Sequence, residues 1–322
     1  MLATVSPPGS AAPARRVGLP CGHNLYVVNS ASDNLAVIDM RTNRIAAMLA
    51  TGKAPVNPTF SPDWQQLYVS NSVAGTLSVF DTRSGRLAAT IPVPGPKPSG
   101  LAFTRDGKRL VITFLGETLD TIGMVGVMDV ASGKFGKTIP VGAQPERLAL
   151  SPDGTRAYVA NLRARSMSVV DLVKDEVVAT IPLGEYPFNV LATPDGRRVY
   201  VGNVKGSTIA EIDTATNQVV RNIETARGPN GMAFSPDHRR IYVSNVYGNR
   251  VQVLDLASGA VSAGADVGPM PGFIRLTQDG RTAYFVRPYG SSVNALDTRT
   301  MTITASIEPG KGPSTLAICG GP

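Results

Sequence analysis

The chain repeats itself about every 42 residues, and this repeat restricts its fold more than any other feature. A short apolar phrase ending in Asn occurs at residues 25–29, 67–71, 157–161, 199–203 and 241–245. A second phrase ends each time in an aspartate, at Asp39, Asp81, Asp129, Asp171, Asp213, Asp255 and Asp297. The period is interrupted only by one longer interval, between Asp81 and Asp129. A fixed period of this length indicates a repeat architecture.

Each repeat contains four short apolar segments of strand length. In the second repeat they cover residues 67–70, 76–80, 86–93 and 99–103, and they are rich in Val, Ile, Tyr and Phe. Four strands in each of seven repeats predict an all-β, seven-bladed β-propeller with four antiparallel strands per blade. A solenoid of the same units is the alternative, but it would leave two sheet ends without a capping repeat.

The turns between these segments also recur. Gly85 ends one turn, and Asn43 and Asn217 hold the same position in two other repeats. Gly and Asn tolerate a positive φ, so we expect left-handed backbone at these positions.

The recurring phrases resemble a known family. Tyr-Val-x-Asn, the Asp-Thr/Leu-x-Ser/Thr-Gly/Asn turn and the Ser-Pro-Asp-Gly turn are similar to the YVTN-repeat β-propellers over residues 24–319. WD40 blades and the lactonase-type and streptogramin-lyase-type propellers are more distantly similar. The family includes surface-layer, periplasmic and enzymatic members, so the resemblance implies a fold and not one function.

The same analogy predicts how the ring closes. In such blades the Ser-Pro-Asp-Gly turn joins the innermost strand to the second strand. The chain should therefore begin on a second strand, at residues 25–29, and end on an innermost strand, at residues 315–319. These N-terminal strands and the C-terminal strand would complete one blade and leave no free sheet edge.

Two cysteines lie at this closure. By the analogy, Cys319 aligns with Ser61 and Cys21 with Asp63, two positions that are close together in an intact turn. The expected Cα separation suits a Cys21–Cys319 disulfide, and two reduced buried thiols are the alternative. A disulfide implies a periplasmic or extracellular protein, whereas a reduced pair would fit the cytoplasm.

The N-terminus has a different composition from the repeats. Residues 1–20 are rich in Pro, Ala and Ser and contain no apolar signal-peptide core. We expect a flexible tail at residues 1–20 and one propeller domain at residues 21–322.

Positions where one blade departs from the others are candidates for function. Arg147 and Arg275 stand on innermost strands, and Arg287 replaces the repeated Asn. A buried arginine needs an anion or a polar partner. We therefore predict a site for a small anionic ligand where the central channel opens.

Aromatic walls of this site are expected from Phe114, Tyr186, Phe188 and Phe273. The alternative is that the arginines pair with Glu117, Asp120 or Glu146 and plug the channel.

The sequence predicts a binding scaffold first and an enzyme second. It has two His and no Gly-x-Ser-x-Gly elbow, phosphate loop or His-x-x-His pair, so we expect no metal and no cofactor. The streptogramin-type lyases are expected to use a His with a divalent metal, and no such His can be placed here. A metal-independent lyase, cyclase or lactonase acting on an anionic metabolite is the alternative. Its acid–base candidates are Glu117, Asp120, Glu146, Tyr247 and Tyr289.

Composition limits the partners. The net charge is +7, yet the basic turn residues alternate with aspartates and the chain has one Trp, so nucleic acid is an improbable partner. No run of 18 apolar residues occurs, so no membrane-spanning helix is expected. We expect a monomer that binds a small anionic molecule or a protein partner.

Overall fold

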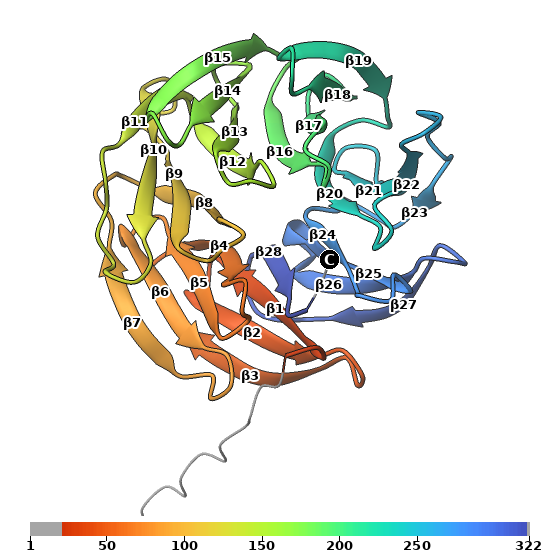
Figure 1. Ribbon diagram of the computed structural model, residues 1–322. Helices are drawn as coiled ribbons and strands as arrows, with labels where there is room; N and C mark the ends of the chain where they lie inside the picture. Colours follow the sequence, from red (N-terminus) through yellow and green to blue (C-terminus); the bar gives the residue numbers. More distant parts are fainter. Residues whose placement is uncertain (1–20, 321–322) are drawn as a thin grey trace, which may run out of the picture.

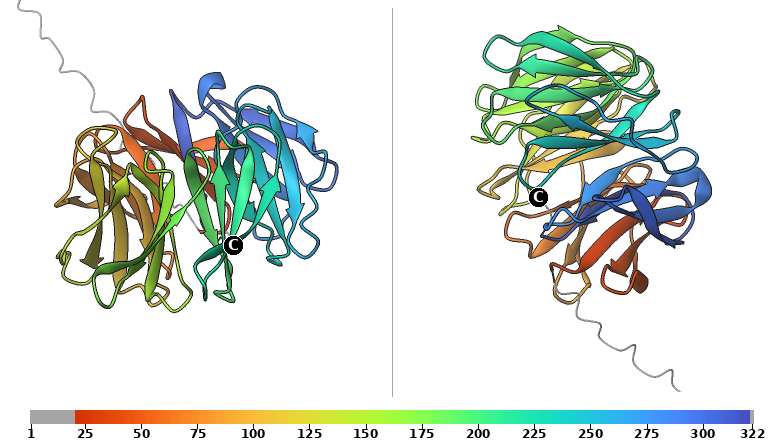
Figure 2. Two further views of the ribbon diagram at one scale, coloured as in Figure 1. Left: turned by 90° about the horizontal axis from the view of Figure 1, so that it is seen from above. Right: turned by 90° about the vertical axis from the view of Figure 1, so that its right-hand side faces the viewer.

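Seven four-stranded antiparallel sheets form a closed ring. The computed structural model describes residues 21–320, and its sheets stand as blades around a central axis (Figure 1). The two views of Figure 2 show the same blades from the side. This arrangement confirms the predicted seven-bladed β-propeller. The predicted tail, residues 1–20, lies outside the described residues, and the division into a tail and one domain stays a prediction.

The strands of each blade run in order from the channel to the outer edge. Blades 1 to 4 consist of β28 (Pro313–Ile318), β1 (Asn24–Asn29), β2 (Asn34–Asp39), β3 (Arg44–Ala50); β4 (Pro55–Phe60), β5 (Gln66–Asn71), β6 (Thr76–Asp81), β7 (Leu87–Pro92); β8 (Pro98–Phe103), β9 (Arg109–Phe114), β10 (Ile122–Asp129), β11 (Ile139–Ala143); and β12 (Pro145–Leu150), β13 (Arg156–Asn161), β14 (Ser166–Asp171), β15 (Glu176–Pro182). Blades 5 to 7 consist of β16 (Pro187–Ala192), β17 (Arg198–Asn203), β18 (Thr208–Asp213), β19 (Gln218–Glu224); β20 (Pro229–Phe234), β21 (Arg240–Asn245), β22 (Arg250–Asp255), β23 (Ala265–Asp266); and β24 (Ile274–Leu276), β25 (Thr282–Arg287), β26 (Ser292–Asp297), β27 (Thr302–Ile307). The helical content of residues 21–320 is one 3₁₀ turn, η1 (Pro288–Gly290).

The core lies between neighbouring blades. Successive residues of a strand point to opposite faces of its sheet. On β1, Tyr26 packs toward blade 2, and the next residue, Val27, packs toward blade 7. Both faces of the second strands are therefore buried, which explains their continuous apolar sequence. The outer strands are much more exposed, as on β7.

The ring closes as the family analogy predicted. β28 pairs antiparallel with β1, and Leu25 lies opposite Ile318. Cys21 and Cys319 form a disulfide, with their Cα atoms 5.1 Å apart. The C-terminal strand and the N-terminal strands thus complete blade 1.

The repeated turns are built by local hydrogen bonds. In blade 2 the Ser61 hydroxyl donates to the Asp63 carboxylate at 2.6 Å, and the same Ser/Thr–Asp contact recurs in the other five complete turns. In the turns between third and fourth strands, Gly85, Asn43 and Asn217 have the expected positive φ. Asp175 and Met301 take the same conformation in two further blades, which the sequence did not indicate.

These turn aspartates predict acid sensitivity. The Ser or Thr hydroxyl, followed by a backbone N–H, holds the pKa of each carboxylate below its ordinary value. A depressed folded-state pKa stabilises the fold above the unfolded pKa of about 4, and this stabilisation disappears as the pH falls through the folded pKa. We expect the thermal midpoint to fall steeply below about pH 4, with a shallower fall in Asp237→Asn. A midpoint that stays constant down to about pH 3 would contradict this expectation.

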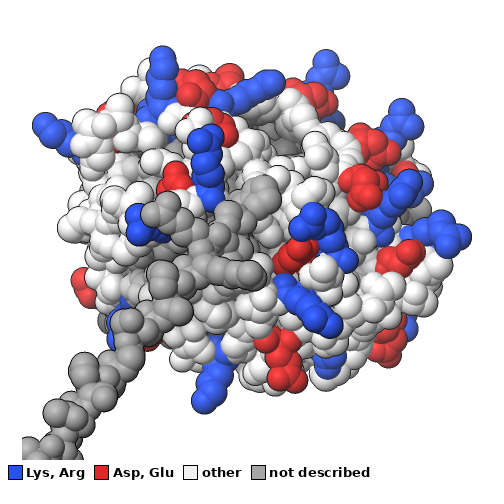
Figure 3. Space-filling view, turned by 90° about the horizontal axis from the view of Figure 1, so that it is seen from below, with Lys and Arg blue, Asp and Glu red and all other residues white. Residues whose placement is uncertain are grey.

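The charges on one side of the ring are mixed. In Figure 3, the Lys and Arg residues on the part of the surface that is not grey stand among Asp and Glu residues, with uncharged surface between them. This side therefore does not form the continuous basic surface that nucleic acid favours. Residues 21–320 include no helix with the length and apolar character needed to cross a membrane.

Candidate functional site

The seven blades place one residue each at the same level beside the central channel, in register with the second strands. These residues form a ring of Asn57, Gly100, Arg147, Asn189, Gly231, Phe273 and Thr315. Gly231 is required here, because a Cβ would lie 2.5 Å from the carbonyl oxygen of Gly272. The ring therefore combines close backbone packing with one cation, Arg147.

Arg147 extends across the channel. It stands on β12 of blade 4, and its guanidinium carbon lies 4.5 Å from the ring centroid of Phe273 in blade 7. The Phe188 ring of blade 5 is 5.8 Å from the same carbon. Both contacts suit cation–π attraction. Only 7% of Arg147 is exposed, and burial lowers its pKa to about 10, with nearby Glu146 opposing the shift and Arg275 adding to it. The guanidinium remains charged at neutral pH.

Two residues at this level have buried donors without partners. Within residues 21–320, Nε and Nη1 of Arg147 and Nδ2 of Asn189 have no hydrogen-bond acceptor, and Asn189 is 5% exposed. Most other unpartnered buried side-chain atoms are acceptors, namely Oδ1 of the repeated Asn29, Asn71, Asn161, Asn203 and Asn245. Those acceptors recur from blade to blade, so they belong to the blade architecture. The unpartnered donors of Arg147 and Asn189 stand on two neighbouring innermost strands, β12 and β16, and such donors attract an anion or a strong acceptor.

A cavity of about 370 Å³ opens above this guanidinium. Arg147, Phe188, Phe273, Glu146, Tyr247 and Tyr289, all predicted from sequence, line it together. Residues that the sequence analysis did not single out complete the lining: Val56, Val204, Asn230, Val246, Met270, Gly272, Pro288, Ser314 and Thr315. Asn189 was also missed as a site residue, although the repeat alignment places it at the same level as Arg147.

The acid–base candidates of the cavity differ in exposure. The Glu146 carboxylate accepts hydrogen bonds from Gln144 at 2.8 Å and Ser99 at 3.2 Å, and it forms no ion pair with a described residue. Tyr247 is 49% exposed and Tyr289 is 80% exposed. The two tyrosines form an aromatic rim, and Glu146 is fixed in the wall.

Two of the predicted arginines lie outside the cavity lining. Arg275 stands on β24, and its Nη1 donates to the carbonyl of Ile274 at 2.9 Å. The Nε of Arg287 donates to the carbonyl of Pro269 at 3.2 Å. Neither arginine is paired with Glu117, Asp120 or Glu146.

Tyr186, Glu117 and Asp120 also lie apart from the cavity lining. The Tyr186 hydroxyl contacts Arg163 at 3.0 Å, and the ammonium of Lys205 lies 4.2 Å from the Tyr186 ring centroid. Hydrogen bonds with Lys205 and Arg163 lower the pKa of Tyr186. Asp120 pairs with the same Arg163 at 3.3 Å, and the backbone carbonyl of Glu117 accepts from a lysine. These residues form a polar cluster on the surface.

Phe114 is placed in the core and not at the channel. It is 0% exposed and packs with the apolar residues between blades 2 and 3. It offers no surface to a ligand in this structure. Phe114 is therefore a core residue, while ligand binding by the cavity residues stays a prediction.

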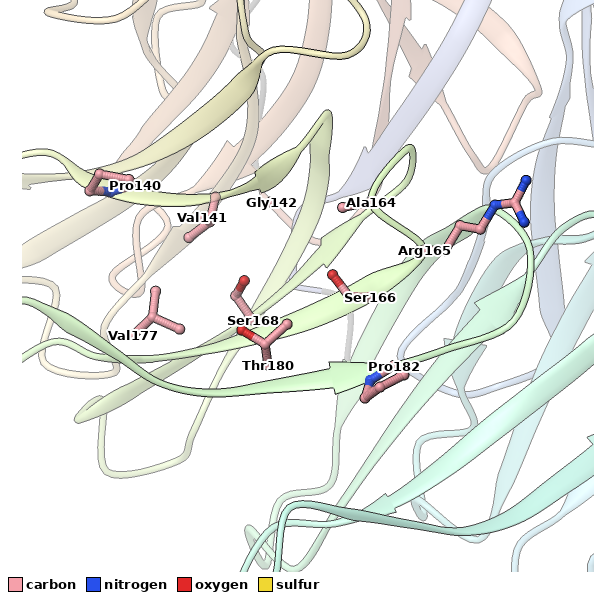
Figure 4. A pocket seen from close by; sticks show the side chains of 10 residues that line it. All are labelled: Pro140, Val141, Gly142, Ala164, Arg165, Ser166, Ser168, Val177, Thr180 and Pro182. Carbon is pink, nitrogen blue, oxygen red and sulfur yellow. The ribbon is translucent and has the colours of Figure 1, made fainter.

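A wider groove lies between blades 3 and 4, with a volume of about 570 Å³ (Figure 4). Its serines, Ser166 and Ser168, already accept hydrogen bonds from Asn161 at 3.2 and 2.9 Å. Arg165, its charged lining residue, points away from these serines in Figure 4 and pairs with Glu185 at 3.3 Å. The groove lacks the unpartnered cation that distinguishes the channel mouth.

The described residues also contain no group of three His, Cys, Asp or Glu side chains arranged to hold a metal ion.

Comparisons with known proteins identify the fold. No protein-family model matches the sequence, and no curated protein matches it. A functionally unknown protein from Desulfotomaculum acetoxidans is similar in structure, with a TM-score of 0.80, 19% identity and coverage of 92% of this chain and 99% of that chain. Hydrazine synthase of Kuenenia stuttgartiensis has a TM-score of 0.76 and 20% identity, with coverage of 92% and 99%. The periplasmic gluconolactonase of Pseudomonas aeruginosa has a TM-score of 0.76 and 19% identity, with coverage of 91% and 98%. Such identities establish a shared propeller fold, and membership of the YVTN-repeat family stays a prediction.

Proposed function

We propose that this propeller binds a small ligand whose anionic group contacts Arg147 at the channel mouth. The unpartnered donors of Arg147 and Asn189 carry this proposal. A buried guanidinium that is not hydrogen-bonded to a carboxylate is costly, and an oxyanion that accepts from Nε and Nη1 offsets that cost. Asn189 adds a further donor from the neighbouring blade.

The rest of the ligand is apolar or aromatic. Phe188, Phe273, Tyr247, Met270 and Tyr289 line the cavity above the guanidinium. Aromatic side chains in such a cavity gain from stacking and apolar contact. A cavity of about 370 Å³ suits a small metabolite with one anionic end.

A screen of carboxylate, phosphate and aromatic-acid metabolites tests the proposal. We expect an aromatic or apolar carboxylate to raise the thermal midpoint of the wild type. Arg147→Gln should bind it roughly 10- to 150-fold more weakly, because a hydrogen bond to a charged group contributes about 1.5–3 kcal/mol. Isothermal calorimetry measures the two affinities.

Arg287→Gln is the matched control, since this arginine contacts a backbone carbonyl outside the cavity. Its affinity should equal that of the wild type. Equal affinities for wild type and Arg147→Gln would refute the proposed contact. If no anion binds and Arg147→Gln melts earlier than the wild type, Arg147 is a structural plug of the channel.

An enzyme remains the second candidate, because Glu146, Tyr247 and Tyr289 line the cavity that contains Arg147. A metal-independent lyase, cyclase or lactonase would use these groups for proton transfer to an anionic metabolite. Product analysis of each ligand found in the screen separates binding from turnover. Turnover that is lost in Glu146→Gln while binding persists would identify an enzyme.

The Cys21–Cys319 disulfide supports a periplasmic or extracellular location, because such bonds persist in oxidising compartments. The ligand would then be met outside the cytoplasm.

A further inference from the structure

A β-bulge brings Glu146 to the channel mouth. On β12, the residues on either side of Glu146 pair with two consecutive residues of β13, Asn161 and Ala160, so Glu146 has no residue opposite it. The same irregularity occurs in β4 and β20. Bulges of this kind re-aim a side chain, and they are frequent beside binding sites. The equivalent positions of six blades all line the cavity of about 370 Å³: Val56, Glu146, Phe188, Asn230, Gly272 and Ser314.

Glu146 and Arg147 are the charged residues of this cavity lining. The two side chains leave β12 toward different blades. The carboxylate of Glu146 contacts Ser99 of blade 3, whereas the guanidinium of Arg147 lies beside the aromatic rings of blades 5 and 7. Nε and Nη1 of Arg147 accordingly have no acceptor among the described residues. One cavity thus contains a negative and a positive charge that do not pair with each other.

The charge of Glu146 has no cationic partner within residues 21–320. Its carboxylate accepts from the Gln144 amide at 2.8 Å and from the Ser99 hydroxyl at 3.2 Å. Both donors are neutral, so they orient the carboxylate and leave its charge in place. A carboxylate has about four acceptor positions, so it can still accept from an ammonium group. The aromatic rim of Tyr247 and Tyr289 also attracts cations.

We propose that the ligand of this cavity is an aminocarboxylate in which an apolar segment separates the two charged groups, with its carboxylate on Arg147 and its ammonium on Glu146. This inference rests on the proposed anion contact at Arg147 and names the class of ligand. A ligand with only a carboxylate would place two negative groups and one cation in the cavity. A zwitterion adds no net charge, and each of its charged groups meets an opposite one.

Two pairs of compounds test the class on the wild-type chain. They are 4-(aminomethyl)phenylacetate with 4-ethylphenylacetate, and 8-aminooctanoate with nonanoate. Within each pair a methyl group replaces the ammonium and the shape is kept. Isothermal calorimetry at constant ionic strength should show roughly tenfold tighter binding of the amine in each pair, because a charged hydrogen bond to Glu146 more than offsets the dehydration of the ammonium.

Glu146→Gln should reverse this order. The amine would then be dehydrated without an anion beside it, so it should bind more weakly than its methyl partner. The methyl partner should bind at least as tightly as it does to the wild type, because a negative charge near its carboxylate has been removed. Glu308→Gln is the matched control, since it removes an exposed carboxylate that does not line the cavity, and it should keep the wild-type order. The wild-type comparison decides the case even if Glu146→Gln does not fold.

The outcomes separate this inference from the anion contact on which it rests. If the methyl compounds bind through Arg147, as shown by their loss of affinity in Arg147→Gln, but the amines bind no more tightly in either pair, the anion contact stands and the aminocarboxylate is overturned. An amine preference that persists in Glu146→Gln would also overturn it. If neither member of either pair binds, the anion contact and the aminocarboxylate fail together.

Discussion

Removing the Cys21–Cys319 disulfide should lower the free energy of unfolding by about 4–5 kcal/mol, the largest stability effect that we expect from one change. The two cysteines are separated by 298 residues, so the bond closes a loop of nearly the whole chain. In the chain-entropy model, long loops restrict the unfolded state most. The bond also holds β28 against β1 at the point where the ring closes.

The other blades show what the disulfide replaces. Where blade 1 has Cys319 and Cys21, blade 2 has Ser61 and Asp63, joined by a hydrogen bond of 2.6 Å. A hydrogen bond of this kind contributes about 1 kcal/mol. Blade 1 consists of two separate chain ends, so a bond that also constrains the unfolded chain has a larger effect there than in a continuous turn.

Chemical denaturation of three proteins measures the effect. The double variant Cys21→Ser with Cys319→Ser should lose the full stabilisation of about 4–5 kcal/mol. Cys21→Asp with Cys319→Ser recreates the turn of the other blades and should recover only about 1 kcal/mol. Ser235→Ala removes the equivalent hydrogen bond of blade 6 and should cost about 1 kcal/mol. A double serine variant as stable as the oxidised wild type would show that strand pairing alone closes the ring.

The fold and the disulfide were predictable because both depend on repetition. Seven copies of one unit reveal strand length, turn chemistry and the blade to which each end belongs. Cys21 and Cys319 could be paired because Asp63 and Ser61 stand at the same positions of a complete turn. The residue types that the repeats share at each position identify a blade, even though the other side chains differ between repeats.

The site was predicted less completely, since a departure from the repeat has two possible causes. Arg147 departs because it faces the channel, whereas Phe114 departs because the core of one blade is packed differently. Sequence position alone does not separate the two cases. The distinction requires knowing which neighbour leaves room for the side chain. For Phe114 that neighbour is Gly126, whose missing Cβ makes room for the ring.

Phe114→Ala should lower the free energy of unfolding by about 3–5 kcal/mol, as large core truncations do. The ring of Phe114 is fully buried, and a Cβ added to Gly126 would lie 2.5 Å from it. In blade 2 the matching pair is Asn71 and Ser78, joined by a hydrogen bond of 2.9 Å. Blade 3 thus exchanges a polar pair for one large ring beside a glycine.

This exchange allows a compensating variant. Phe114→Asn alone leaves a cavity and a buried amide without its hydroxyl partner, so it should be at least as destabilising as Phe114→Ala. Adding Gly126→Ser restores the Asn–Ser pair and should recover a large part of the loss, giving a coupling free energy of about 1–3 kcal/mol in a double-mutant cycle. Denaturation measures the cycle, and ligand affinity at Arg147 should be the same in every variant that folds. Additive effects in the cycle would refute the pairing, and a change in ligand affinity would return Phe114 to the binding site.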